Sequence, residues 1–173
     1  RMLTAPMDYT PGAMHNATRQ DYHPIDDNPM SQGTRVHQMA MYTVFDAPLQ
    51  MLSDKPSLYE RFPECTDFIS KVPTVFDDCR TLQGEMGEYI VTAKRKGATW
   101  FVGAMTSWKE RELELKLDFL DNATYKAVIF RDGVNASRNA EDYKLEEKTV
   151  KKGDVLKITM KSGGGWTARF EKM

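Results

Sequence analysis

The stretch RELELKLDFL, residues 111–120, alternates apolar and charged side chains along most of its length. Leu113, Leu115, Leu117 and Phe119 fall on one face, and charged residues fall on the other. A period of two residues is that of a β-strand with one buried face and one solvated face. This stretch therefore predicts a strand of a sheet that is covered on one side.

The region after Pro73 repeats this signal. Turn residues such as Asp132-Gly133 and Gly163-Gly164-Gly165 separate six further strand-like segments: EYIVTAKR, TWFVGAMT, YKAVIFRD, YKLEEKTV, VLKITM and WTARFEK. About seven strands at short spacing, with no helical period between them, are typical of an antiparallel sandwich or barrel. We therefore expect residues 73–173 to form an antiparallel β-sandwich or barrel domain.

Before residue 73 the apolar residues follow a helical period instead. Residues 33–48 carry an apolar stripe so wide that we expect a helix packed on more than one side, ended by Pro48; the stripe comprises Val36, Met39, Ala40, Met41, Thr43, Val44 and Phe45. LQML, residues 49–52, predicts a short buried strand, and residues 63–72 predict an amphipathic helix. The order in this part is strand, loop, helix, strand, loop, helix. Joined to the β-rich part after residue 73, it predicts an α+β chain.

Composition argues against several classes of protein. The chain has 173 residues and a formal net charge of −1, without the basic excess of a nucleic-acid-binding or peripheral membrane protein. No apolar run approaches the roughly 20 residues that span a bilayer. We expect neither nucleic acid nor a membrane as partner. Cys65 and Cys79 lack the spacing of a zinc site, so we expect no metal ligands here, and Cys65 to be buried.

Short motifs are explained by structural roles. His15, His23 and His37 are too far apart for a paired metal motif, and we expect His37 to make a structural hydrogen bond. The glycines of GGGW, residues 163–166, lead into a strand, so a hairpin turn is favoured over a phosphate cradle. In residues 131–142, turn-forming Asp and Asn are favoured over a calcium loop.

Two sets of residues are candidates for sugar contacts. The first expected strand lies in the opening stretch RMLTAPM, and Asp8, Tyr9 and Thr10 follow it. Asp54 follows the second expected strand, LQML. These are the strand ends that form the active-site face of a (β/α) barrel. Turn-forming or structural roles explain each of these residues at least as well. Trp108, near a strand end, is the aromatic residue best placed to stack on a sugar, whereas we expect Trp100 and Phe101 in the core.

Long segments of the chain resemble glycoside hydrolase family 97, the α-glucosidases and α-galactosidases found mainly in Bacteroidetes. They run in family order over nearly the whole chain: PMDYTPGAM, NPMSQGTRVHQMAMYTVFDAPLQML, PECTDFISKVPTVFD, GEYIVTAKRKG, WFVGAMTSW, LDFL, FRDGVNA and SGGGW. The family pattern is an N-terminal β-sandwich, a central (β/α)8 barrel and a C-terminal β-sandwich. By this resemblance, residues 1–72 are the incomplete end of the barrel, its last two β/α units, and residues 73–173 are the C-terminal sandwich.

The resemblance implies a fragment of an enzyme that cleaves α-linked glucosides or galactosides. The catalytic carboxylates and calcium-binding glutamates of the family lie upstream of the first residue, so we expect no catalytic residue in this chain and calcium in the full-length enzyme. The substrate would be an α-linked oligosaccharide. The resemblance also implies a homo-oligomer formed through the C-terminal domain and a periplasmic or secreted location.

The acids present agree with this expectation. Glycoside hydrolysis needs two facing carboxylates, about 5 Å apart for retention or roughly 6.5–9.5 Å for inversion. The acids here occupy turns or alternating positions of strands, such as Glu112 and Glu114. The sequence leaves open which sugar is cleaved and with which stereochemistry. A second hypothesis, a non-catalytic carbohydrate-binding sandwich, rests on Trp100 and Trp108.

Overall fold

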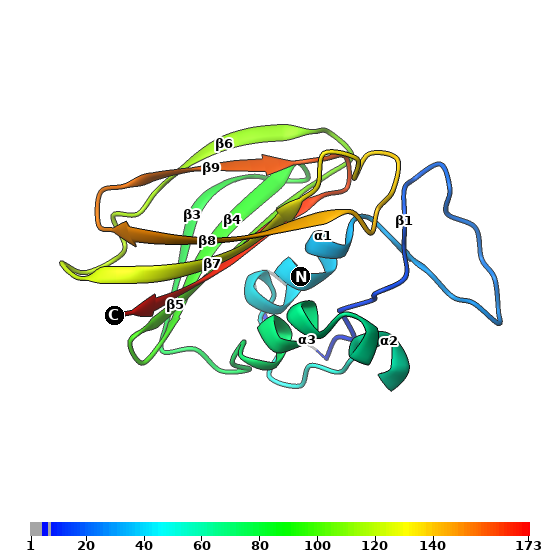
Figure 1. The fold of residues 1–173 in the computed structure, drawn as a ribbon, viewed down its shortest axis with the longest axis horizontal. Coiled ribbons are helices and arrows are strands. Elements are labelled where there is room, and N and C mark those ends of the chain that lie inside the picture. Colours follow the sequence, from blue (N-terminus) through cyan, green and yellow to red (C-terminus); the bar gives the residue numbers. More distant parts are fainter. Residues whose placement is uncertain (1–4, 7) are drawn as a thin grey trace.

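A computed structural model describes residues 5, 6 and 8–173, in which helices lie along one side of a β-sandwich (Figure 1). The elements, in chain order, are β1 (Asn16–Ala17), β2 (Ser31–Gln32), α1 (Arg35–Val44), α2 (Pro56–Arg61), α3 (Pro63–Ser70), β3 (Asp78–Glu85), β4 (Tyr89–Lys96), β5 (Thr99–Thr106), β6 (Arg111–Lys116), β7 (Thr124–Asp132), β8 (Tyr143–Lys151), β9 (Val155–Met160) and β10 (Gly165–Lys172). The strands after residue 73 outnumber the helical elements, so the described chain is mainly β.

The sandwich consists of an antiparallel six-stranded sheet, in the order β3-β4-β5-β10-β7-β8, and an antiparallel pair, β6-β9. Leu115 and Leu117 point into the core between the sheets, as the alternation at residues 111–120 predicts. All seven expected strands are present, but β3 was not predicted. It is an edge strand with a bulge between Thr81 and Gln83, and most of its side chains are exposed or half-buried, so it lacks a clear apolar alternation.

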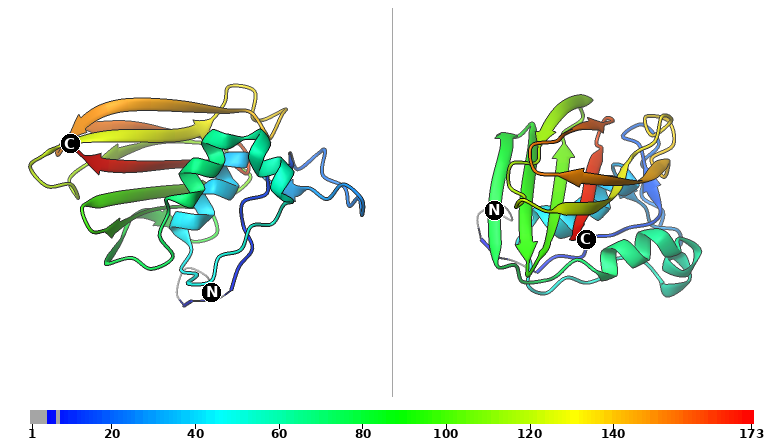
Figure 2. Two further views of the ribbon diagram at one scale, coloured as in Figure 1. Left: turned by 60° about the horizontal axis from the view of Figure 1, so that its bottom comes forward. Right: turned by 60° about the vertical axis from the view of Figure 1, so that its left-hand side comes forward.

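Helix α1 covers the face of the six-stranded sheet that is turned away from β6 and β9 (Figure 2). On β5, Trp100 and Val102 pack into the sandwich core, whereas Phe101 packs with Val36 and other side chains on the helical side. Burial on both faces explains why this strand reads as a nearly continuous apolar run. Apart from His37, every residue of α1 is buried, which confirms a helix packed on more than one side.

Glycines on two neighbouring strands allow this close packing. A Cβ atom at Gly103 of β5 would lie 2.9 Å from the carbonyl oxygen of Ala40, and one at Gly165 of β10 would lie 2.6 Å from the backbone nitrogen of His37. Such contacts are closer than a real Cβ tolerates. The helix backbone therefore rests directly on the sheet.

The predicted strand at residues 49–52 is wrong in extent and burial. One parallel bridge joins Tyr9 to Gln50, and Leu49, Met51 and Leu52 are about half exposed, because no further strand covers them in the described part of the chain. The first expected strand lies partly outside the described residues. The amphipathic helix is α3, in which Cys65, Phe68 and Ile69 are buried as expected, while the short helix α2 was not predicted.

Candidate functional site

The residues after Thr10 form a buried segment, Pro11–Asn16, here called the 11–16 loop. A buried loop must find partners for its backbone polar groups. Side chains supply them: the Tyr42 hydroxyl donates to the Pro11 carbonyl over 3.0 Å and the Tyr59 hydroxyl to the Gly12 carbonyl over 2.9 Å. Gln38 Oε1 accepts from the Gly12 N–H at 3.2 Å. Helices α1 and α2 therefore fix the path of this loop.

Asp54 takes part in the same network. Its Oδ2 accepts hydrogen bonds from the backbone N–H groups of Met14 at 2.5 Å and His15 at 3.4 Å. The carboxylate of this rim candidate thus holds the 11–16 loop, which is a structural role. A groove of about 530 Å³ lies beside it, lined by Leu52, Tyr59 and residues of α2 and α3.

Segment 9–11 runs beside segment 50–53. The Met51 N–H donates to the Tyr9 carbonyl at 3.3 Å, and the Ser53 N–H donates to the Pro11 carbonyl at 3.2 Å. The fold therefore brings the first group of rim candidates next to the segment that directly precedes Asp54. Asp8 and Thr10 are exposed, whereas Tyr9 packs edge-on against Phe45, and burial raises the pKa of its hydroxyl.

Trp108 belongs to a different part of the molecule, the connection after β5. Its side chain is 36% exposed, which leaves it accessible. However, its ring lies against Gly163, where any Cβ would overlap it, and the Arg19 guanidinium carbon is 5.6 Å from the ring centroid. Protein groups thus already contact the ring that a sugar would need. Trp100 and Phe101 are buried, as expected.

Asp132, at the end of β7, is the residue that sequence reasoning missed. It is buried, and it accepts hydrogen bonds from the Thr34 hydroxyl at 2.7 Å and from the N–H groups of Lys161 at 2.8 Å and Gly165 at 3.1 Å. Burial raises the pKa of its carboxyl group to about 6, against the opposing effect of these hydrogen bonds. The Asp-Gly pair indicated a turn, and nothing local in sequence pointed to a partner at Thr34.

The glycine segment 163–165 does not form a hairpin, because it connects β9 in one sheet to β10 in the other. The Gly163 carbonyl accepts from the Thr34 N–H at 3.0 Å, and Nδ1 of His37 lies 2.9 Å from the Gly164 carbonyl. Burial lowers the pKa of His37. The start of α1 is therefore seated on this turn, and His37 has the structural hydrogen bond expected for it.

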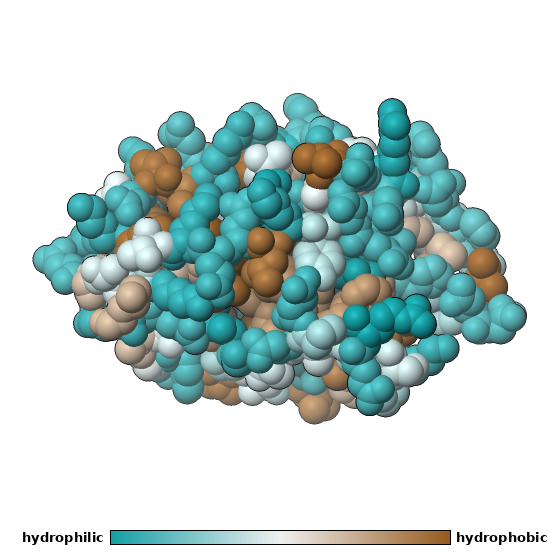
Figure 3. Space-filling model, viewed as in Figure 1, coloured by the Kyte–Doolittle hydropathy of each residue, from teal (hydrophilic) through white to brown (hydrophobic). Residues whose placement is uncertain are grey.

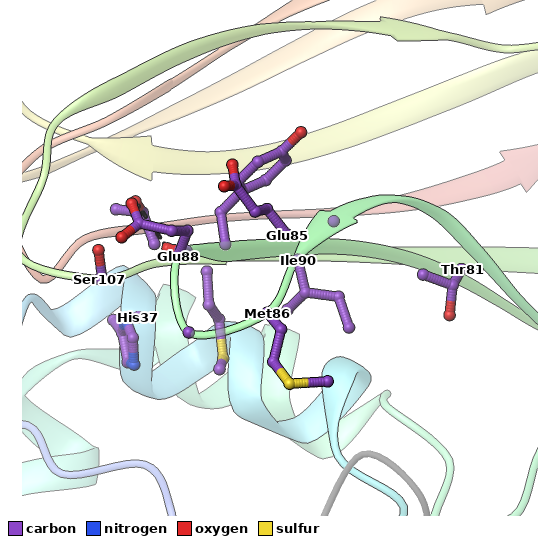
Figure 4. Close-up of a pocket in the computed structure, with 12 residues that line it drawn as sticks. His37, Thr81, Glu85, Met86, Glu88, Ile90 and Ser107 are labelled. Atoms are coloured by element: carbon purple, nitrogen blue, oxygen red, sulfur yellow. Dashed lines mark hydrogen bonds between the residues drawn. The ribbon is translucent and has the colours of Figure 1, made fainter.

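A second groove, of about 470 Å³, lies between the β3–β4 hairpin and α1 (Figure 4). Its lining includes Met86, Ile90 and Met105, together with Glu85 and Glu88 on the hairpin. Glu88 forms an ion pair with Arg111 on β6. The groove is mainly apolar. Of its two glutamates, Glu85 is exposed and Glu88 is half-buried and paired with Arg111, so neither is a buried acid.

The face shown in Figure 3 is largely hydrophilic, with separate apolar patches. Among the residues that the structure describes, no group of three or more His, Cys, Asp or Glu side chains is placed to hold a metal ion. In the same part of the chain, no helix has the length and apolarity to cross a bilayer.

Comparison with known proteins identifies the family. A family described as "Glycosyl-hydrolase 97 C-terminal, oligomerisation" matches residues 75–171. The chain is 49% identical over 171 residues to a protein named "Retaining alpha-galactosidase" from Bacteroides thetaiotaomicron, which covers 99% of this chain and 26% of that protein. The chain belongs to glycoside hydrolase family 97.

Two further relatives agree with this assignment. A "Probable retaining alpha-galactosidase" from Streptomyces bingchenggensis is 25% identical over 97% of this chain and 24% of that protein. A solved family 97 enzyme in complex with panose, from Pseudoalteromonas sp. strain K8, superposes with a TM-score of 0.89 at 33% identity, over 99% of this chain and 27% of that one. The chain thus spans about a quarter of the length of the relatives it matches.

Proposed function

We propose that this chain is the C-terminal quarter of a retaining α-galactosidase. The observation that carries the proposal is the 49% identity, over 99% of the chain, to the Bacteroides retaining α-galactosidase. Galactose as the sugar and retention as the stereochemistry both follow from that relative. Two facing carboxylates, which retention requires, would come from upstream segments.

The arrangement of the first 72 residues supports the end of a (β/α)8 barrel. Segments 9–11 and 50–53 run parallel, and α1 lies between them in the chain, which is the connection that parallel strands need. Leu49, Met51 and Leu52 are about half exposed and offer an apolar surface for the remaining strands. Residues 1–72 would complete the barrel, and residues 73–173 would support it.

In this arrangement the chain shapes the rim of the sugar site. Asp8 lies just before segment 9–11 and Thr10 lies within it, and both are exposed, so that they can exchange hydrogen bonds with sugar hydroxyls. Tyr9, which packs on Phe45, and Asp54, which accepts from the Met14 N–H, would support the rim structurally. The sandwich would also join copies of the enzyme, in keeping with the oligomerisation domain it matches. On the family resemblance, calcium would be bound by upstream residues of the full-length enzyme. The same resemblance suggests that the enzyme is periplasmic or secreted.

The test uses the full-length protein with 4-nitrophenyl α-galactoside and 4-nitrophenyl α-glucoside, followed by ¹H NMR of the first sugar released. Faster hydrolysis of the galactoside, with α-galactose as the first product, is expected. Release of β-galactose first would contradict retention. Hydrolysis of the glucoside alone would contradict the proposed substrate.

A further inference from the structure

Arg35 occupies an unusual position for a cation. It is the first residue of α1, where the helix dipole disfavours positive charge, and it is only 2% exposed. Its guanidinium carbon lies 3.9 Å from the centroid of the Phe62 ring. This position of the charge does not stabilise the helix dipole. The contacts of the guanidinium group must therefore offset the cost of burying it.

Those contacts join the 11–16 loop to the sandwich. Nη2 of Arg35 donates to the Met14 carbonyl at 2.5 Å and forms an ion pair with Oε2 of Glu141 at 2.9 Å. Glu141 lies in the connection between β7 and β8, and its Oε1 accepts from the Asn16 N–H at 3.4 Å. The Glu141 carboxylate of the sandwich thus contacts the 11–16 loop directly, at the Asn16 N–H, and indirectly, through Arg35.

We propose that Arg35 and Glu141 are positioning residues of the α-galactosidase, through which the sandwich sets the 11–16 loop and hence the substrate rim at Asp8 and Thr10. The other side chains that hold this loop, Gln38, Tyr42, Asp54 and Tyr59, come from the barrel-like half. The inference rests on the proposed function and extends the role of the sandwich beyond oligomerisation.

The first test measures amide hydrogen exchange in the 173-residue chain with Glu141→Gln. Glutamine keeps the shape but leaves one oxygen for two donors and removes the charge. We expect exchange at Asn16 to be about tenfold faster, because the hydrogen bond from its N–H to the charged Glu141 carboxylate is lost or weakened. Glu146→Gln is the matched control, since Glu146 pairs with Arg131 inside the sandwich. Equal exchange at the loop in both variants would overturn the proposal.

The second test measures kinetics of the full-length protein with Glu141→Gln and Arg35→Lys. Lysine keeps the charge but lacks the planar guanidinium, which packs on Phe62 and places its Nη2 between the Met14 carbonyl and Glu141. We expect KM for an α-galactoside to rise about tenfold with a smaller change in kcat, because the rim is displaced while upstream carboxylates stay in place. Glu146→Gln should leave both constants unchanged. Faster loop exchange with unaltered KM would overturn the positioning role. An inactive wild-type enzyme would overturn the proposed function but not the exchange result.

Discussion

Thr34 Oγ1 donates a hydrogen bond of 2.7 Å to Oδ1 of Asp132, a residue 98 positions away. The same hydroxyl oxygen accepts from the His37 N–H at 3.1 Å and so caps the start of α1. A single hydroxyl therefore serves the helix as acceptor and the sandwich as donor. The start of α1 is fixed by both halves of the chain together.

Thr34→Val should lower the free energy of unfolding by about 1–3 kcal/mol, because it removes the cap and leaves a buried carboxylate without one donor. Urea unfolding of the 173-residue chain measures the change. Thr149→Val, at an exposed position of β8, is the control and should change stability little. Equal effects of the two substitutions would contradict the role of Thr34.

Asp132 should give stability a defined pH dependence. Its pKa is about 6 in the fold, above its ordinary value of 3.8, so the folded state binds more protons between these values. The stability due to this group is therefore present at low pH and is lost as pH rises through about 6, a change of about 2–3 kcal/mol. The nearby charge of Lys161 acts in the opposite direction. In Asp132→Asn this slope should disappear from urea unfolding measured between about pH 4 and 7. Parallel curves for the two proteins would contradict the raised pKa.

Gly103→Ala should destabilise the chain by about 1–3 kcal/mol, because the new methyl group would force α1 away from β5. The Cβ would lie 2.8 Å from Cγ2 of Val44. Thermal unfolding measures the effect. Gly87→Asn is the control, since Gly87 has φ of 77° with no atom within 4 Å of its Cβ position, and Asn tolerates this conformation. If Gly103→Ala were as stable as the wild-type chain, the close packing would be wrong.

The β-domain could be predicted from sequence because a strand buried on one face has alternating apolar residues, and a strand buried on both faces has a continuous apolar run. The alternation at Leu113, Leu115 and Leu117 predicted β6, and the apolar run around Val102 predicted β5. The edge strand β3 shows neither pattern, because its side chains are exposed or half-buried. LQML was read as a buried strand because its composition is apolar, yet in the described chain it has a single bridged neighbour.

The site was less predictable for a different reason. Asp8, Tyr9, Thr10 and Asp54 could be singled out because they follow expected strands, and segments 9–11 and 50–53 do lie side by side. The partners that decide their roles are distant in sequence. Asp132 meets Thr34 across 98 positions, and Asn16 meets Glu141 across 125. No local pattern encodes such contacts.

A carbohydrate-binding role for the sandwich makes a separate prediction about Trp108. Because Gly163 and Arg19 already contact its ring, we expect α-linked gluco- and galacto-oligosaccharides to cause no saturable change in tryptophan fluorescence of the 173-residue chain. A saturable change that is lost in Trp108→Ala, and kept in the exposed-aromatic control Tyr22→Ala, would favour the binding-module hypothesis instead.

We propose that this chain belongs to an α-galactosidase whose catalytic acids lie outside it. The most direct measurement compares hydrolysis of 4-nitrophenyl α-galactoside by the 173-residue chain and by the full-length protein under the same conditions. We expect turnover by the full-length protein and none by the 173-residue chain. Turnover by the chain alone would show that its own carboxylates catalyse the reaction, and would contradict the proposed function.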